Sequence, residues 1–211
     1  MCRTVLGSRN GWSMGGGVPP VPIRELRDLT RYRTGLIQER VRETQRLQKV
    51  LEDAGVKLAS VATDILGALG RAMLEALVAG TTDPEVPAEL ARGRLRAKLP
   101  ALRAALAGRF RGHHGCLVSE LLAHLDDLEE ASERLTRQIE EPLRPFAPLV
   151  QPLEAIPGLH HRAIEGIVAE IGVDMRPFPS DAHLVSWAGI CPGPHESAGK
   201  PTSGKTRTGT R

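Results

Sequence analysis

The residues best suited to chemistry lie near the C-terminal end, at positions 194–200, with the sequence Pro-His-Glu-Ser-Ala-Gly-Lys. Here the hydroxyl of Ser197 stands on an expected loop beside a potential base and a cation, the combination that a nucleophile for phosphoryl chemistry uses. A serine on such a loop is also an ordinary surface feature, so the motif alone leaves both interpretations open.

A second candidate site is the sequence Pro157-Gly158-Leu159-His160, between two apolar stretches. In a helix-hairpin-helix unit, such a turn presents backbone N–H groups at the start of the second helix, where they can hold a DNA phosphate. Gly158, Leu159 and His160 are therefore candidate DNA contacts, although His160 replaces the usual second glycine. The alternative is a plain pair of helices in which the flanking isoleucines and valine only form core.

Basic residues form two further groups. Lys200, Lys205 and Arg207 lie in a tail without an acid after Glu196, and such a tail could follow a phosphate backbone. Residues 90–119 contain seven arginines and lysines and no acid, whereas the next helix is acidic, which suggests one face for nucleic acid and another for partner helices. Both groups could equally be solvated surface.

No metal site is predicted. The histidine pairs at 113–114 and 160–161 point in different directions on a helix, and Cys191 with His195 lacks further ligands at useful spacing. The three cysteines are far apart, which fits a reducing cytoplasm. No segment has the roughly 20 apolar residues of a membrane helix.

The elements that position these residues should be mainly α-helical, because only 3% of residues are aromatic and Leu, Ala, Arg and Glu are abundant. Residues 1–22 are expected to be disordered or unrelated. A helical pattern follows over 23–54 and ends at Gly55, with apolar stripes that include Tyr32 and Val41 at steps of three, four or seven. Further helical patterns follow over 58–79, ending at Gly80, and over 85–107, with a break near Pro100.

A heptad of apolar residues from Leu117 to Ile139 has the spacing of a coiled-coil seam, which predicts packing within the chain or a homo-oligomer. Residues 23–141 are thus expected to form a helical and coiled-coil region, and prolines make 142–152 a stiff connector. In the C-terminal domain, 153–211, a helix-hairpin-helix-like unit ends near Gly172, and a short helix over 181–188 contributes Leu184, Val185 and Trp187 to a core. Residues 189–211 are expected to be loop.

Several blocks from Ile156 to Arg211 resemble the C-terminal domain of insertion-sequence one-ten family transposases, relatives of the pilin-gene invertase. The blocks are Ile-Pro-Gly at 156–158, Ile-Val-Ala-Glu-Ile-Gly at 167–172, Phe-Pro-Ser at 178–180, Ser-Trp-Ala-Gly at 186–189 and Glu-Ser-Ala-Gly-Lys at 196–200. Residues 23–49 resemble the start of that family's coiled coil.

The resemblance implies DNA as substrate, a structured guide RNA as partner and a serine that bonds covalently to DNA, which by position is Ser197, with Lys200 as a phosphate neighbour. It also implies a resolvase-like (RuvC-like) domain that holds Mg²⁺. This chain is expected to lack that domain, and so to be a fragment without a cofactor of its own and inactive alone.

The sequence therefore predicts a fragment of a transposase that binds DNA and carries the serine nucleophile. Two alternatives remain. One is an inactive nucleic-acid-binding regulator that sequesters transposase subunits, and the other is a helical adaptor unrelated to DNA, whose binding would lack the salt dependence of phosphate contacts.

Overall fold

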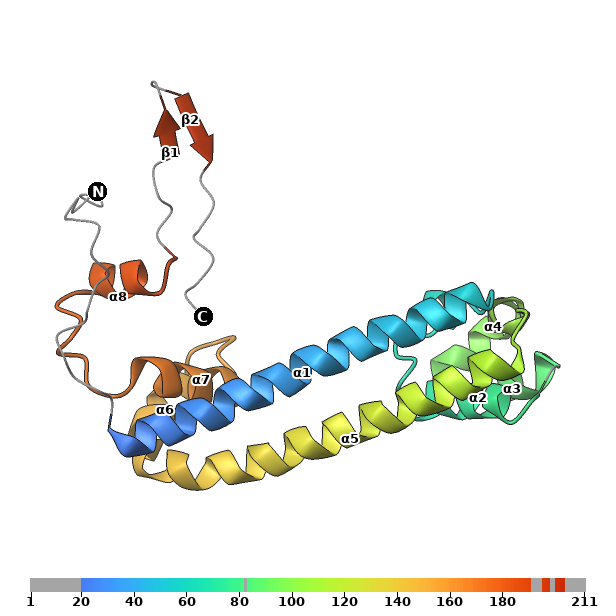
Figure 1. The fold of residues 1–211 in the computed structure, drawn as a ribbon, viewed down its shortest axis with the longest axis horizontal. Helices are drawn as coiled ribbons and strands as arrows, with labels where there is room; N and C mark the ends of the chain where they lie inside the picture. Colours follow the sequence, from blue (N-terminus) through green and yellow to red (C-terminus); the bar gives the residue numbers. More distant parts are fainter. Residues whose placement is uncertain (1–19, 82, 191–194, 198–199, 204–211) are drawn as a thin grey trace. The chain divides into compact units, whose positions relative to one another are not determined.

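The structure is a computed structural model that describes residues 20–81, 83–190, 195–197 and 200–203. It is mainly α-helical, as predicted (Figure 1). The helices are α1 (Val21–Asp53), η1 (Leu58–Ser60), α2 (Ala68–Val78), α3 (Glu85–Glu89), η2 (Gly93–Lys98), α4 (Leu99–Leu106), α5 (Gly112–Leu143), η3 (Arg144–Phe146), α6 (Ala147–Glu154), α7 (His161–Ile171) and α8 (Asp181–Trp187). Two short strands, β1 (His195–Ser197) and β2 (Lys200–Ser203), follow them.

The chain divides into two compact units. The helical unit is Asp28–Glu141, and the C-terminal unit combines Met1–Arg27 with Pro142–Arg211. The disorder expected for residues 1–22 concerns mostly residues 1–19, which lie outside the described residues, whereas α1 already begins at Val21.

Within the helical unit, α1 and α5 form an arm of two antiparallel helices, which lie side by side in Figure 1. Cross-contacts run in opposite directions along the two helices. Arg33 Nη1 lies 3.5 Å from Thr136 Oγ1, and Arg40 Nε lies 2.6 Å from Glu129 Oε2. The heptad of α5 therefore packs against α1 of the same chain.

The buried seam of the arm agrees with the predicted heptad at Leu125, Leu128, Ser132 and Ile139, which are buried, and differs from the prediction elsewhere. Tyr32 and Val41, expected on the apolar stripe of α1, are exposed, while Thr30, Arg33 and Glu43 are buried. On α5, Leu117 is exposed and Val118 is buried, so the seam begins one residue later than expected. The residues of α1 that are buried are those that face α5, and several of them are polar.

The head of the helical unit is residues 54–111, which pack on the adjoining ends of α1 and α5. Its core is aliphatic and includes Leu58, Met73, Leu74 and Leu102, all fully buried. Burial of these apolar side chains is the main source of stability for the short helices of the head.

Local signals fix the helix ends of the head. Gly55 has φ +76°, and the Val56 N–H donates to Leu51 O at 2.8 Å, which closes α1 with a Schellman motif as the sequence predicted. Gly80 ends α2 similarly, at φ +89°. Pro100 lies in the first turn of α4, where its missing N–H costs nothing, so the predicted break near Pro100 is the boundary between η2 and α4.

The helix predicted over 58–79 is interrupted. Residues 61–67 are not helical, because Asp64 Oδ1 accepts the Leu66 N–H at 2.9 Å and α2 starts only after Gly67. Gly70 allows this tight packing, since a Cβ there would lie 2.5 Å from the Ile65 carbonyl oxygen.

The chain enters and leaves the head at one place. The Arg109 N–H donates to Ala54 O at 2.6 Å, and the Lys57 N–H donates to Ala105 O at 2.8 Å. Gly108 lies between these two hydrogen bonds, and a Cβ on Gly108 would lie 2.5 Å from Ala54 O. A side chain would push the two chain segments apart, so the closure of the head depends on this glycine.

In the C-terminal unit, Arg27 of α1 caps the end of α7. Its guanidinium donates to Ala169 O at 2.9 Å and to Glu170 O at 3.1 Å, two of the carbonyls that have no partner within a helix that ends at Ile171. A positive charge also interacts favourably with the negative end of the helix dipole. Arg27 thus fixes the beginning of α1 to the end of α7.

The prolines of residues 142–152 lie within helical turns. Helix α5 continues through Pro142 to Leu143, η3 follows, and α6 contains Pro152. Among the residues that the structure describes, no helix is long and apolar enough to cross a membrane.

Candidate functional site

The turn between α6 and α7 carries three of the candidate DNA contacts. Gly158 has φ +87°, a left-handed conformation that glycine adopts at no steric cost. The Leu159 N–H donates to Ile156 O at 3.1 Å, and the carbonyl of His160 accepts the N–H groups of Ala163 and Ile164. The chain therefore turns tightly and enters α7 directly after His160.

His160 itself is exposed, stands at the N-cap of α7 and makes no side-chain capping bond. The apolar residues around the turn divide into two groups. Ile164 and Val168 are buried, as the alternative of a plain pair of helices expects, but Ile156 is 50% exposed. The residues before the turn are thus open to solvent, whereas the apolar side chains of α7 after the turn are buried.

Basic residues in the first turn of α7 lie near two glutamates, one in α6 and one further along α7. His161 Nδ1 lies 2.6 Å from Glu154 Oε1, and its Nε2 lies 3.4 Å from Oε1 of the buried Glu165. Arg162, which the sequence analysis did not single out, is exposed in the same turn. Its position in the first turn after the glycine was the signal that could have identified it.

The segment around Ser197 is a strand ladder where a loop was expected. Strands β1 and β2 are antiparallel, and the register pairs Ser197 with Lys200 and Glu196 with Pro201, with an irregularity between His195 and Glu196. Two residues, Ala198 and Gly199, separate the strands in the sequence, and such a spacing with a glycine is a hairpin signal. The correction brings the candidate nucleophile and the candidate phosphate contact to opposite positions of one ladder.

Lys205 and Arg207, the other candidate contacts in the basic tail, lie outside the described residues. Between α7 and α8, Asp174 and Arg176 form an exposed ion pair with Nη2 2.7 Å from Oδ2. Hydrogen bonds from the Arg176 side chain and backbone lower the pKa of Asp174 to about 2. This carboxylate therefore stays charged over the whole neutral and weakly acidic range.

Helix α8 forms where predicted, but its proposed core residues are not buried. Val185 is 38% exposed and Trp187 is 42% exposed. The indole of Trp187 meets the ring of Phe178 edge to face, with centroids 5.6 Å apart. A helix of seven residues has too little surface to bury both side chains against one neighbouring ring.

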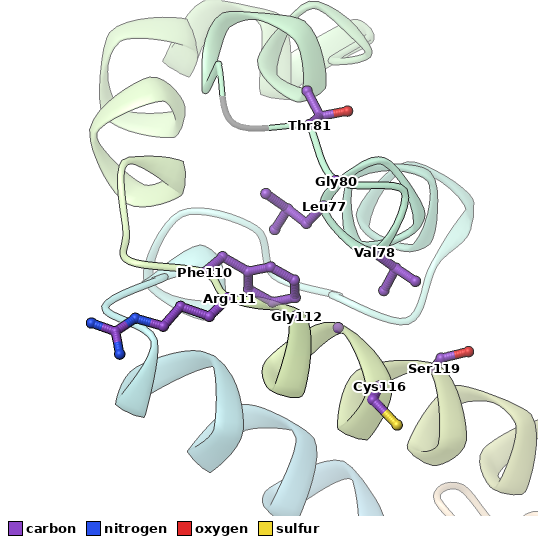
Figure 2. A pocket seen from close by; sticks show the side chains of 10 residues that line it. Leu77, Val78, Gly80, Thr81, Phe110, Arg111, Gly112, Cys116 and Ser119 are labelled. Atoms are coloured by element: carbon purple, nitrogen blue, oxygen red, sulfur yellow. The ribbon is translucent and has the colours of Figure 1, made fainter.

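A groove of about 350 Å³ lies in the head, away in sequence from these residues (Figure 2). It is lined by Leu77 and Val78 at the end of α2, by Phe110 and Arg111 just before α5, and by Cys116 within α5. Figure 2 shows the Arg111 side chain extending away from Leu77 and Val78. The groove contains none of the candidate site residues.

The residues that the structure describes include no group of three or more His, Cys, Asp or Glu side chains placed to hold a metal ion. A Mg²⁺ site needs several oxygen ligands, usually carboxylates. The described residues thus do not fit the metal that the family resemblance implies.

Comparison with known proteins finds a match to a protein family. Residues 150–211 match the family described as Transposase IS116/IS110/IS902 family, a span that begins within α6 and includes α7, α8 and both strands. The match confirms the resemblance for this segment. No curated protein and no solved structure matches the chain.

Proposed function

We infer, from the match of residues 150–211 to the IS116/IS110/IS902 transposase family, that this chain takes part in DNA transposition. We assign Ser197 the role of the nucleophile that bonds to DNA and Lys200 that of a phosphate contact. The observation that carries this proposal is the register that sets Ser197 opposite Lys200 within the matched segment. Opposite residues are nearest neighbours across an antiparallel ladder, so one phosphate group could reach both positions.

The proposed step is a transesterification at phosphorus. The Ser197 oxygen attacks a phosphodiester, a bond from this oxygen to phosphorus forms, and the bond from phosphorus to one deoxyribose oxygen breaks. The serine proton passes to a neighbouring base, for which His195 or Glu196 is available in the sequence, and the released deoxyribose oxygen takes up a proton. A cation at Lys200 would stabilise the charge that develops on the phosphoryl oxygens.

The Mg²⁺ that the resemblance implies would be held elsewhere than by the described residues, because they lack a fitting cluster. When bound, such an ion would supply polarisation of the phosphoryl group and activation of the attacking oxygen. The proposal assigns no step of this chain to it.

We further propose that the turn at Gly158, Leu159 and His160 contacts the DNA backbone, with Lys205 and Arg207 of the tail. Support comes from the exposure of the turn and of Arg162 beside it. Glu154 and Glu165 flank His161, so the phosphate would be held by backbone N–H groups and Arg162 more than by the imidazole. Such contacts position DNA without selecting a sequence.

The test is complementation. A full-length transposase of this family whose own nucleophilic serine is replaced by alanine should give no transposition of a reporter element. Supplying this chain should restore covalent protein–DNA products, and Ser197→Ala should remove them. Ser203→Ala, at the far end of the same ladder, is the matched control and should retain them. Equal restoration by wild type and Ser197→Ala would refute the role of Ser197.

A second candidate function is a regulator that pairs with transposase subunits through the arm, as a homo-oligomer would. The exposed Tyr32 and Val41 on α1 favour it, because each offers a large apolar side chain to a partner, on opposite sides of the helix at about 100° per residue. In the same reporter, with an intact transposase, this function predicts that co-expression lowers transposition and that Ser197→Ala lowers it equally. The structured guide RNA is a further proposed partner and rests on the family resemblance.

A further inference from the structure

A short segment of the head concentrates exposed positive charge. Arg92, Arg94, Arg96 and Lys98 lie within residues 92–98, and all four are exposed. Three of them belong to η2, which connects α3 and α4, two helices labelled in Figure 1. We call these four residues the basic turn. They lie far in sequence from the segment that matches the transposase family.

Packing holds the basic turn in a fixed orientation. Leu95, in the middle of η2, is half-buried and packs against the core of the head, as does Leu99 directly after it. A 3₁₀-helix has about three residues per turn, so neighbouring side chains diverge by about 120°. With Leu95 directed to the core, Arg94 and Arg96 extend outward on either side of it.

The nearest acids along the chain are engaged by another residue. Arg103 of α4 lies 2.8 Å from Glu85 Oε2 and 3.1 Å from Glu89 Oε1, and both of these carboxylates belong to α3. In the part of the chain that the structure describes, Arg92, Arg94 and Arg96 take part in no ion pair. Their charges are therefore available to a partner.

One acid does face the basic turn. A hollow of about 430 Å³ separates η2 from residues 61–70, and Arg94, Lys98 and Asp64 all line it. Asp64 also accepts the Leu66 N–H, and Lys98 Nζ lies 3.4 Å from Val61 O across the hollow. Asp64 offsets one of the four positive charges, and the surface keeps an excess of cations.

We propose that the basic turn binds the phosphate backbone of double-stranded DNA. At about 2 Å per residue, the six residues of η2 extend about 12 Å. Phosphates of one DNA strand repeat about every 3.4 Å along the helix axis, so this length faces about three or four of them.

The surroundings favour a duplex over a single strand. Proteins that bind single strands stack bases on aromatic side chains, and residues 92–98 contain none. Contacts from arginine and lysine to phosphates alone would hold DNA without reading its sequence. The basic turn is thus a second DNA contact, in the head, that goes beyond the one proposed at α7 and the tail.

The test is the salt dependence of DNA binding by the full chain. Affinity for a mixed-sequence DNA duplex is measured by fluorescence anisotropy at several salt concentrations, for wild type and for the triple variant Arg92→Gln, Arg94→Gln, Arg96→Gln. Each lost phosphate contact lowers the slope of log affinity against log salt by about 0.9, so the triple variant should lose about 2 to 3 units of slope. These side chains are exposed, so the circular dichroism spectrum should not change.

Two comparison variants separate the basic turn from other causes. The triple variant Arg42→Gln, Lys49→Gln, Arg137→Gln removes the same charge from exposed positions of the arm, and its slope should stay near that of wild type. The triple variant Lys200→Gln, Lys205→Gln, Arg207→Gln tests the tail independently, so a failure of either contact is distinguishable from a failure of the other.

Three results would overturn the proposal. The first is an unchanged slope in the basic-turn variant. The second is an equal loss in the arm variant, which would mean that only total charge matters. The third is a loss confined to an RNA duplex measured in parallel, which would assign the surface to RNA.

Discussion

Replacing Gly108 by alanine should open the point where the chain enters and leaves the head. The added Cβ would lie 2.5 Å from Ala54 O, 2.8 Å from Val56 Cγ2 and 2.9 Å from Gly55 C. Two of these three atoms are backbone and cannot move aside cheaply. The φ of Gly108 lies outside the left-handed region, so steric overlap alone decides the effect.

Two effects contribute to the loss of folding free energy in Gly108→Ala. Overpacking at a site of this kind costs about 1–3 kcal/mol. Separating the two segments also weakens the hydrogen bond from the Arg109 N–H to Ala54 O, which contributes about 0.5–1.5 kcal/mol net. We therefore expect Gly108→Ala to lower the free energy of unfolding by about 2–4 kcal/mol, a shift of about 1–2 M in the urea midpoint.

The assay is urea unfolding of the full chain followed by circular dichroism, with amide hydrogen exchange at Lys57 and Arg109. Gly35→Ala is the matched control, because Gly35 lies in α1 and a Cβ there meets nothing within 4 Å. Alanine should stabilise that helix by about 0.5–1 kcal/mol. If Gly108→Ala is as stable as wild type and both amides keep their protection, the closure of the head does not depend on this glycine.

Two further predictions concern the C-terminal unit. Arg27→Met should lower the free energy of unfolding of this unit by about 1–2 kcal/mol, because α7 loses the guanidinium that caps its C-terminal carbonyls. Amide hydrogen exchange should become faster in α7 but not in the head. Unchanged exchange in α7 would contradict the capping role. The pKa of Asp174 is about 2 in the folded chain against 3.8 ordinarily, so the stability that this ion pair contributes is present above pH 3.8 and is lost as the pH falls toward 2. In an NMR titration, Arg176→Gln should raise the pKa of Asp174 toward 3.8, and a midpoint that stays near 2 would exclude Arg176 as the cause.

Helix ends were predictable because their signals are local. Gly55 and Gly80 end helices where the sequence places them, and Gly172 follows the last residue of α7. A left-handed glycine closes a helix through bonds within its own last turn, so no distant residue is needed.

The seam of the arm was not predictable from one helix. Tyr32 and Val41 fit an apolar stripe, but the face that meets α5 carries Arg33 and Glu43. The sequence pattern of a single helix does not specify which face a partner covers, and a two-helix arm is narrow enough that long polar side chains reach its edge.

The candidate site was predicted in part. The turn at Gly158 follows from its composition, whereas the ladder that pairs Ser197 with Lys200 was missed. Strands of three and four residues with Pro, Ser and Thr show no alternation of apolar and polar residues, so only the short Ala-Gly spacing indicated them.

The adjacent entry and exit of the head have an evolutionary consequence. Because Ala54 and Arg109 are hydrogen-bonded to each other, residues 55–108 form an insertion whose two ends meet. Insertions of this kind can lengthen, shrink or be exchanged while the flanking helices keep their pairing, since closing a longer loop costs little extra entropy. Among related chains the head should therefore vary in length far more than the arm, and a short turn joining α1 directly to α5 should leave the pairing of the two arm helices intact.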